Sequence, residues 1–184
     1  MPELPGQPGR RHLQRVGAER GFDVNVATPV LVDGEVVSST RIRQALRDGA
    51  VEQAARLLGR PFELAGEVVT GLQRGRTIGI PTANVSIPEE LAAPAVGVYV
   101  ARARLTSGET AQAVVNIGFR PTFNGADPRP TCEAHLLDFS GDLYGQTLRL
   151  SFIGRLRGER RFDGIEALVA QIKRDIEEAR RILA

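Results

Sequence analysis

The pattern of apolar residues changes near Gly59, and this change restricts the possible fold more than any other feature. Beyond it, apolar and polar residues alternate with a period of two, as in Tyr99 to Leu105 and Leu148 to Phe152. Such alternation is typical of strands with one buried face. From Ile165 to Leu183, apolar residues instead recur at helical spacing. Turn signals separate the strand-like runs at Ser107-Gly108, Asn124-Gly125 and Ser140-Gly141-Asp142. We therefore expect a mainly β fold, a small antiparallel barrel closed by one C-terminal helix.

The first 58 residues are richer in helical signals. We expect a short strand from Phe22 to Val26 and a helix capped by the hydroxyls of residues 38–40. A further helix begins near Val51 and ends at Gly59. The chain is thus predicted to have two parts, residues 1–58 and residues 59–184.

Composition narrows the class of protein. The 184 residues are 42% hydrophobic and 25% charged, which is typical of a globular chain. A net charge of +2 is too small a surplus to indicate nucleic-acid binding. No run approaches the ~20 apolar residues of a membrane span, and the N-terminus lacks the apolar core of a signal peptide. The single cysteine, Cys132, excludes an intrachain disulfide. We expect a cytoplasmic protein without a membrane or nucleic-acid partner, and composition does not indicate its oligomeric state.

A glycine-rich segment, Gly71 to Asn84, follows the strand-like run Phe62 to Thr70. Its glycines and arginines can bring backbone N–H groups and positive charge close to phosphate oxygens. In an extended segment, residues i and i+2 point the same way, so Thr82 and Asn84 would share a face. Their neutral oxygens could supply part of a Mg²⁺ shell completed by phosphates and water. From the residues alone, a glycine-rich turn followed by a polar strand is equally consistent.

Gly-x-x-x-Gly-Arg followed by Gly-Ile-Pro-Thr-Ala-Asn resembles the signature of riboflavin kinases. Three later blocks are similar to that family and stand in its order: Val115 to Phe123, Glu133 to Gly145, and Leu156 to Asp163. The resemblance covers residues 59–184. It implies a six-stranded Greek-key barrel with a terminal helix. It also implies phosphorylation of the riboflavin 5′-hydroxyl by ATP with Mg²⁺, which yields FMN and ADP.

The resemblance also implies roles for individual residues. Glu133 would be the general base that accepts the proton of the riboflavin hydroxyl. From the residues alone, a solvated surface carboxylate is the commoner interpretation, and Asp138 and Asp142 are rival carboxylates. The candidates for ATP and phosphate binding are Gly71, Arg74, Gly75, Arg76, Gly79, Thr82 and Asn84, and Thr82 and Asn84 are also the candidate metal ligands. The candidates for flavin contacts are Phe119, Arg120, Phe123, Leu156 and Arg157.

The N-terminal part has its own resemblance. Val37 to Arg43 is similar to the Ser-Ser-Thr-x-x-Arg signature near the end of the nucleotidyltransferase domain in bacterial bifunctional FAD synthetases. That domain also uses a His-x-Gly-His motif, and neither His12 nor His135 stands in one. We therefore expect residues 1–58 to be a truncated remnant without FMN adenylyltransferase activity. A fragment, an alternative start and a lineage that lost the activity all remain open. Two other functions also remain open, an incomplete part of a bifunctional FAD synthetase and a non-catalytic flavin-binding module.

Overall fold

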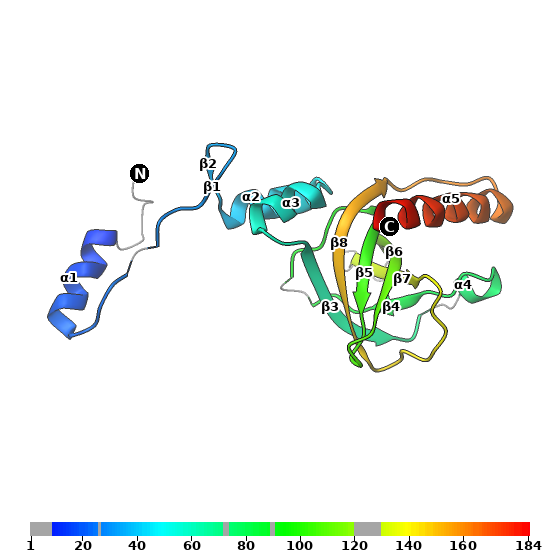
Figure 1. The fold of residues 1–184 in the computed structure, drawn as a ribbon, viewed down its shortest axis with the longest axis horizontal. Coiled ribbons are helices and arrows are strands. Elements are labelled where there is room, and N and C mark those ends of the chain that lie inside the picture. The colour runs from blue at the N-terminus through cyan, green and yellow to red at the C-terminus, as the bar shows by residue number, and fades with distance from the viewer. Residues whose placement is uncertain (1–8, 26, 72–73, 89–90, 120–129) are drawn as a thin grey trace, which may run out of the picture. The chain divides into compact units, whose positions relative to one another are not determined.

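A computed structural model describes residues 9–25, 27–71, 74–88, 91–119 and 130–184 (Figure 1). The chain divides into two compact units, Met1–Val37 and Ser38–Ala184. The first unit contains helix α1 (Arg10–Arg20) and a hairpin of β1 (Leu31–Val32) and β2 (Glu35–Val36). The predicted strand from Phe22 to Val26 is wrong, because residues 22–25 are irregular and pair with no strand; Val26 lies outside the described residues. A short extended run gains little unless another strand satisfies its backbone groups.

The second unit is built around a closed six-stranded barrel, which confirms the expected fold. Its neighbouring strands follow the order β3-β4-β7-β6-β5-β8, and β8 pairs back with β3. Every pair is antiparallel, and β8 returns beside β5 after the meander β5-β6-β7, which is a Greek-key arrangement. The strands are β3 (Phe62–Val69), β4 (Ala83–Val85), β5 (Gly97–Arg104), β6 (Thr110–Phe119), β7 (Pro130–Leu136) and β8 (Thr147–Arg157).

The barrel interior is filled by one set of alternating side chains. Tyr99 and Phe152 are fully buried there, with their rings edge to face at 5.5 Å between centroids. Cys132 is buried in the same core, as expected for a small apolar residue. Burial raises the pKa of its thiol to about 12, so the group stays protonated. The period-two pattern therefore identifies which strand residues face inward.

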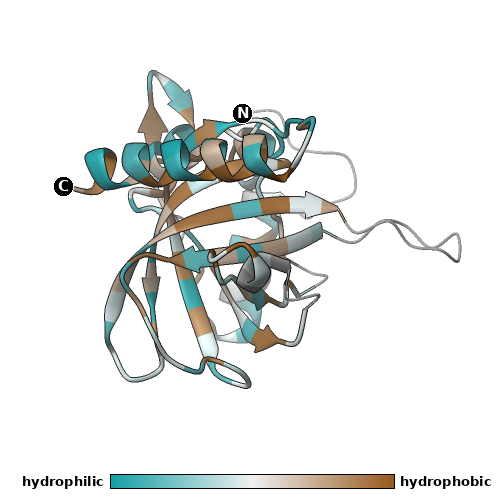
Figure 2. Ribbon diagram, turned by 90° about the vertical axis from the view of Figure 1, so that its right-hand side faces the viewer, coloured by the Kyte–Doolittle hydropathy of each residue, from teal (hydrophilic) through white to brown (hydrophobic). Residues whose placement is uncertain are grey.

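Helix α5 (Ile165–Leu183) lies on the outside of the barrel, against β5, β6 and β8 (Figure 2). Its apolar side, which includes Ala179 and Leu183, covers the outward-facing Val98, Val100 and Val114. Part of the outer face is therefore as apolar as the interior. Among the described residues, no helix combines the length and the apolar character needed to cross a bilayer.

Two further helices, α2 (Ser39–Arg47) and α3 (Val51–Leu58), pack with the barrel in the second unit. The Ser38 hydroxyl caps α2 by accepting a hydrogen bond from the Arg41 N–H at 3.3 Å, as the sequence predicted. Apolar residues of both helices join the same core as the barrel interior: Ala45, Leu46, Val51 and Ala54. Residues 38–58 are thus part of the barrel's compact unit. The predicted division at residue 59 separates a nucleotidyltransferase remnant from a kinase domain by sequence resemblance, and it stays a prediction.

Candidate active site

Three polar residues form a row across neighbouring strands on the outer face of the barrel. Asn84 on β4 is the register partner of Glu133 on β7, and Glu133 is also the partner of Asn116 on β6. The neighbours of Glu133 along the strand are buried inside the barrel, so Glu133 itself faces outward. Directly opposed residues have Cβ atoms about 4.5–5.5 Å apart. Two of the predicted site residues, Asn84 and Glu133, therefore lie side by side although they are far apart in sequence.

Thr82 lies just before β4, two residues from Asn84. The backbone at this point is held against β7 by His135, whose Nδ1 lies 2.7 Å from the carbonyl oxygen of Pro81. A carbonyl oxygen only accepts, so this contact is a hydrogen bond donated by His135 Nδ1–H. His135 thus contributes to the site by holding the segment that carries Thr82.

The glycines of the predicted phosphate loop are needed for close approaches. A Cβ on Gly71 would lie 2.2 Å from Nδ2 and 2.5 Å from Oδ1 of Asn84, so the Asn84 amide packs directly on the Gly71 backbone. A Cβ on Gly75 would lie 2.3 Å from the Ile80 carbonyl oxygen and 3.4 Å from Thr82 Oγ1. Gly71 therefore leaves room for the Asn84 amide, and Gly75 allows the close approach of the Ile80 carbonyl beside Thr82.

The loop also contains a short helical turn, α4 (Arg74–Thr77), which the sequence did not predict. The N–H groups of Ile78 and Ile80 both donate to the Gly75 carbonyl, at 3.3 and 2.8 Å, so they are used within the loop. Gly79 adopts the left-handed conformation with φ of 74°. The side chains of Arg74 and Arg76 lie outside the described part of the structure, and their contacts with phosphate stay a prediction.

The donor set fits magnesium better than a metal held mainly by protein side chains. Within the described residues, no cluster of three or more His, Cys, Asp or Glu could hold an ion. The Thr82 hydroxyl and the Asn84 amide supply neutral oxygens next to the Glu133 carboxylate. Mg²⁺ is commonly bound by one or two protein oxygens while phosphates and water complete its shell. The residues present therefore fit a magnesium ion that arrives with a nucleotide.

A cavity of about 690 Å³ opens beside Thr82. This cavity was not predicted from the sequence, because its walls come from four segments that the fold brings together. These segments contribute Val68, residues 81–83, Ala134 with Leu136, and residues 139–144. Its walls are largely apolar, with a few polar groups such as Ser140 and Asp142. A cavity of this size and character suits a planar organic group.

Of the predicted flavin residues, the structure describes Phe119 at the end of β6, and Leu156 and Arg157 at the end of β8. Phe119, which is 55% exposed, has the strand parity of the inward-facing Ile117, so it lies on the opposite face from Glu133. It lines a separate cavity of about 410 Å³ with Arg47 and Pro130. Arg120 and Phe123 lie outside the described residues. Their contacts with flavin remain predictions.

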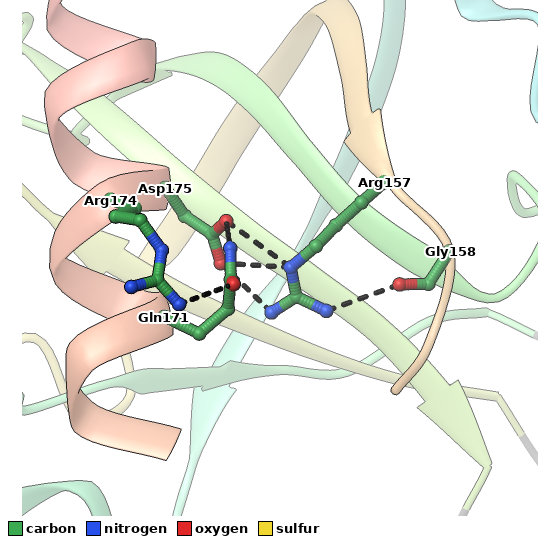
Figure 3. A network of polar contacts seen from close by, with 5 residues as sticks. All are labelled: Arg157, Gly158, Gln171, Arg174 and Asp175. Carbon is green, nitrogen blue, oxygen red and sulfur yellow. Dashed lines mark hydrogen bonds and ion pairs between the residues drawn. The ribbon is translucent and has the colours of Figure 1, made fainter. Parts of the chain in front are cut away.

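Arg157 and Leu156 lie at the end of β8, beneath α5. Nε and Nη2 of Arg157 donate to the Asp175 carboxylate at 2.8–3.1 Å, and Nη1 donates to the Gly158 carbonyl at 3.1 Å (Figure 3). The Arg157 and Asp175 side chains are only 15% and 6% exposed. Gln171 adds a hydrogen bond to Asp175 at 2.8 Å, and Leu156 packs in the apolar layer under the helix. Much of the hydrogen-bonding capacity of Arg157 is therefore used to attach α5 to the barrel, and its predicted flavin contact remains untested.

The two rival carboxylates have other partners. Asp138 accepts a hydrogen bond from Arg180 at 2.8 Å, and this contact lowers the pKa of its carboxyl. Asp142 accepts the Tyr144 N–H at 3.0 Å, which is the turn geometry expected for it. Of the three carboxylates considered, only Glu133 lies in the row beside Asn84.

Comparison with known proteins identifies the family of the barrel. The model of the riboflavin kinase family matches residues 58–183. A bifunctional riboflavin kinase/FMN adenylyltransferase of Pseudomonas fluorescens is 44% identical over 172 residues, which are 94% of this chain and 54% of that protein. The protein of the same name from Bacillus subtilis is 44% identical over 146 residues, 79% of this chain and 46% of its own length.

A solved structure shares the fold of this chain. A crystal structure described as a macrolide-efflux protein from Streptococcus pneumoniae superposes with a TM-score of 0.80 and 37% identity, covering 92% of this chain and 55% of that one. The chain thus spans about half the length of the curated relatives it matches. The family match covers the barrel, the glycine-rich loop and the row that contains Glu133. The chain belongs to the riboflavin kinase family.

Proposed function

We propose that this chain transfers the γ-phosphoryl group of ATP to the 5′-hydroxyl of riboflavin, which gives FMN and ADP. The observation that carries the proposal is the direct pairing of Asn84 with Glu133, two partly exposed residues on the outward-facing side of the barrel wall. The pairing supports the proposal because the proposed ligand of a nucleotide-bound metal, Asn84, lies next to the proposed base, Glu133. Membership of the riboflavin kinase family supports flavin as the acceptor.

In the proposed reaction, the riboflavin 5′-oxygen attacks the γ-phosphorus, and the bond from that phosphorus to the β,γ-bridging oxygen breaks. ADP leaves with the electron pair of this bond, and the proton of the hydroxyl goes to the Glu133 carboxylate. Phosphoryl transfer depends mainly on positioning and on neutralising charge, so the base must lie within reach of the hydroxyl. Glu133 supplies this group at the centre of the row.

Thr82 and Asn84 would hold Mg²⁺, which when bound neutralises phosphate charge and orients the γ-phosphate. Arg74 and Arg76 are the proposed cationic partners of the phosphates. We assign the 690 Å³ cavity beside Thr82 to the nucleoside of ATP, because its apolar walls and few polar groups suit a nucleobase. With Asn84 as a metal ligand, the phosphates of the donor would lie on the β4 side of Glu133.

The test is incubation of the purified chain with riboflavin, ATP and Mg²⁺, followed by chromatographic separation of riboflavin, FMN and FAD. We expect FMN to form, and its formation to stop when the metal is chelated. A second mixture of FMN and ATP should give no FAD, because residues 1–58 lack a His-x-Gly-His motif. Riboflavin that binds without forming FMN would favour a flavin-binding module, and FAD formation would contradict the remnant interpretation.

A further inference from the structure

Asn116 is the third member of the polar row, and neither its position nor its exposure has a structural explanation. It lies in the middle of β6, although asparagine is depleted from strand interiors. It is exposed, and within the described residues its amide makes no side-chain hydrogen bond. By contrast, Gln44 and Gln171, two other amides of the same unit, are hydrogen-bonded to neighbouring carboxylates.

The position of Asn116 relative to Glu133 indicates which substrate it meets. The candidate metal ligand Asn84 lies on the β4 side of Glu133, whereas Asn116 lies on the β6 side. In phosphoryl transfer, the attacking and leaving oxygens are roughly in line, so donor and acceptor lie on opposite sides of the transferred group. The acceptor alcohol therefore extends from Glu133 toward β6.

The outward-facing position next to Asn116 on β5 is buried. The next register partner is Val98, which is 6% exposed and packs in the layer covered by α5. Asn116 is thus the last open position on the acceptor side, between the candidate base and the helix. An acceptor chain bound with its terminal hydroxyl at Glu133 passes over this residue first.

A second polar group lies next to Asn116. Thr131 pairs with Gly118 one step along the outer face, and a Cβ on Gly118 would lie 3.4 Å from Thr131 Oγ1 and 3.6 Å from Asn116 Nδ2. The hydroxyl and the amide therefore flank the same point of the strand. An amide can donate and accept, and so can an alcohol, which makes the pair suited to a polyol.

We propose that the Asn116 amide binds a secondary hydroxyl of the acceptor's polyol chain, with the Thr131 hydroxyl beside it. This makes Asn116 a specificity-determining residue. It favours flavins with a polyhydroxylated side chain over flavins with a plain alkyl alcohol. The assignment rests on the proposed function, because it takes Glu133 as the point where the terminal hydroxyl reacts.

The test compares two acceptors with the full chain. One is riboflavin, and the other is an isoalloxazine that carries an unbranched 5-hydroxypentyl chain, which keeps the terminal hydroxyl but lacks the secondary ones. Asn116→Ala should lower kcat/KM for riboflavin about 3- to 10-fold, the usual range for one neutral hydrogen bond. It should change kcat/KM for the hydroxypentyl flavin less than about 2-fold. Gln112→Ala is the matched control, an amide on the same strand and face, and should alter neither value.

An equal loss with both acceptors would overturn the proposal, because Asn116 would then act on Glu133 or on the fold. No loss with either acceptor would also overturn it. Binding is measured in parallel, without ATP, by quenching of flavin fluorescence. There Asn116→Ala should weaken riboflavin alone. If the parent chain phosphorylates neither flavin, the proposed function fails, and the binding comparison still decides whether Asn116 recognises the polyol.

Discussion

The outer face of the barrel has two parts with opposite character. Under α5 the outward-facing residues are Val98, Val100 and Val114, and all three are buried. On neighbouring strands the same face carries the polar residues Asn84, Glu133 and Asn116, which are at least partly exposed and which we call the open part. The first part stabilises the fold by burying apolar surface. Polar side chains in the second part contribute little to the core, so their presence is better explained by a ligand.

The largest effect should come from the open part. Glu133→Gln keeps the size and hydrogen-bonding reach of the side chain but cannot accept the proton. Turnover of riboflavin should fall about 10²- to 10⁴-fold, the usual contribution of a general base. Riboflavin binding, measured by fluorescence quenching, should change little. A Gln variant with turnover near that of the parent would remove Glu133 from the mechanism.

The next effect belongs to the part under α5. Asp175→Asn leaves the mostly buried Arg157 without its countercharge and should lower the free energy of unfolding by about 3 kcal/mol. Urea unfolding measures this value. Glu178→Gln is the matched control, because it breaks a solvent-exposed pair with Arg181 on the same helix and should leave the midpoint unchanged. Equal effects of the two substitutions would show that Asp175 does not anchor the helix.

Gly71→Ala tests how the open part is shaped. The added Cβ would occupy the position of the Asn84 amide, and the cheapest adjustment is rotation of that amide out of place. FMN formation should fall about 10²-fold, because small displacements of positioning groups have effects of that size. The thermal midpoint should stay within a few degrees of the parent. In the Gly164→Ala control, the added Cβ meets no described atom within 4 Å, so activity should be retained.

The smallest effect concerns the ion pair of Glu63 and Arg149 on the outer face of the barrel. Glu63 on β3 accepts a hydrogen bond from Arg149 at 2.8 Å, which lowers the pKa of Glu63 below its ordinary value of 4.5. Because the pKa of Glu63 is lower in the folded state, the pair stabilises the folded protein at pH values above the unfolded-state pKa. This stabilisation is lost as the pH falls through the folded-state pKa. Glu63→Gln should lower the free energy of unfolding by about 0.5 kcal/mol at neutral pH, since the pair is partly exposed. Urea unfolding at about pH 3 should show a smaller difference, and a larger one there would contradict the assignment.

The sequence predicted the main fold because the inward alternation is strict in long strands such as β5 and β8. It missed the hairpin of β1 and β2, although Asp33-Gly34, with φ values of 55° and 77°, is a recognised two-residue turn signal. It also gave no sign that α2 and α3 pack into the barrel core. Such packing depends on tertiary contacts, which have no local signature.

The candidate site was predictable only in part. The resemblance identified Asn84 and Glu133, but only the β4–β7 register shows that they are direct neighbours. No role for Asn116 was predicted from the sequence, because its position beside Glu133 depends on the register between β6 and β7. The cavity beside Thr82 could not be predicted from the sequence either, since its walls come together only in the folded barrel.

One paired measurement tests the central distinction between the two parts of the outer face. Asn84→Ala and Val114→Ala are purified together, and each is assayed for FMN formation per folded molecule and for urea unfolding. Asn84→Ala should lose most activity with stability unchanged, because its amide is not part of the core. Val114→Ala should lose about 1 to 2 kcal/mol of stability and keep its activity per folded molecule. If Asn84→Ala instead unfolds the barrel while its folded fraction works normally, the open part is structural and the account is wrong.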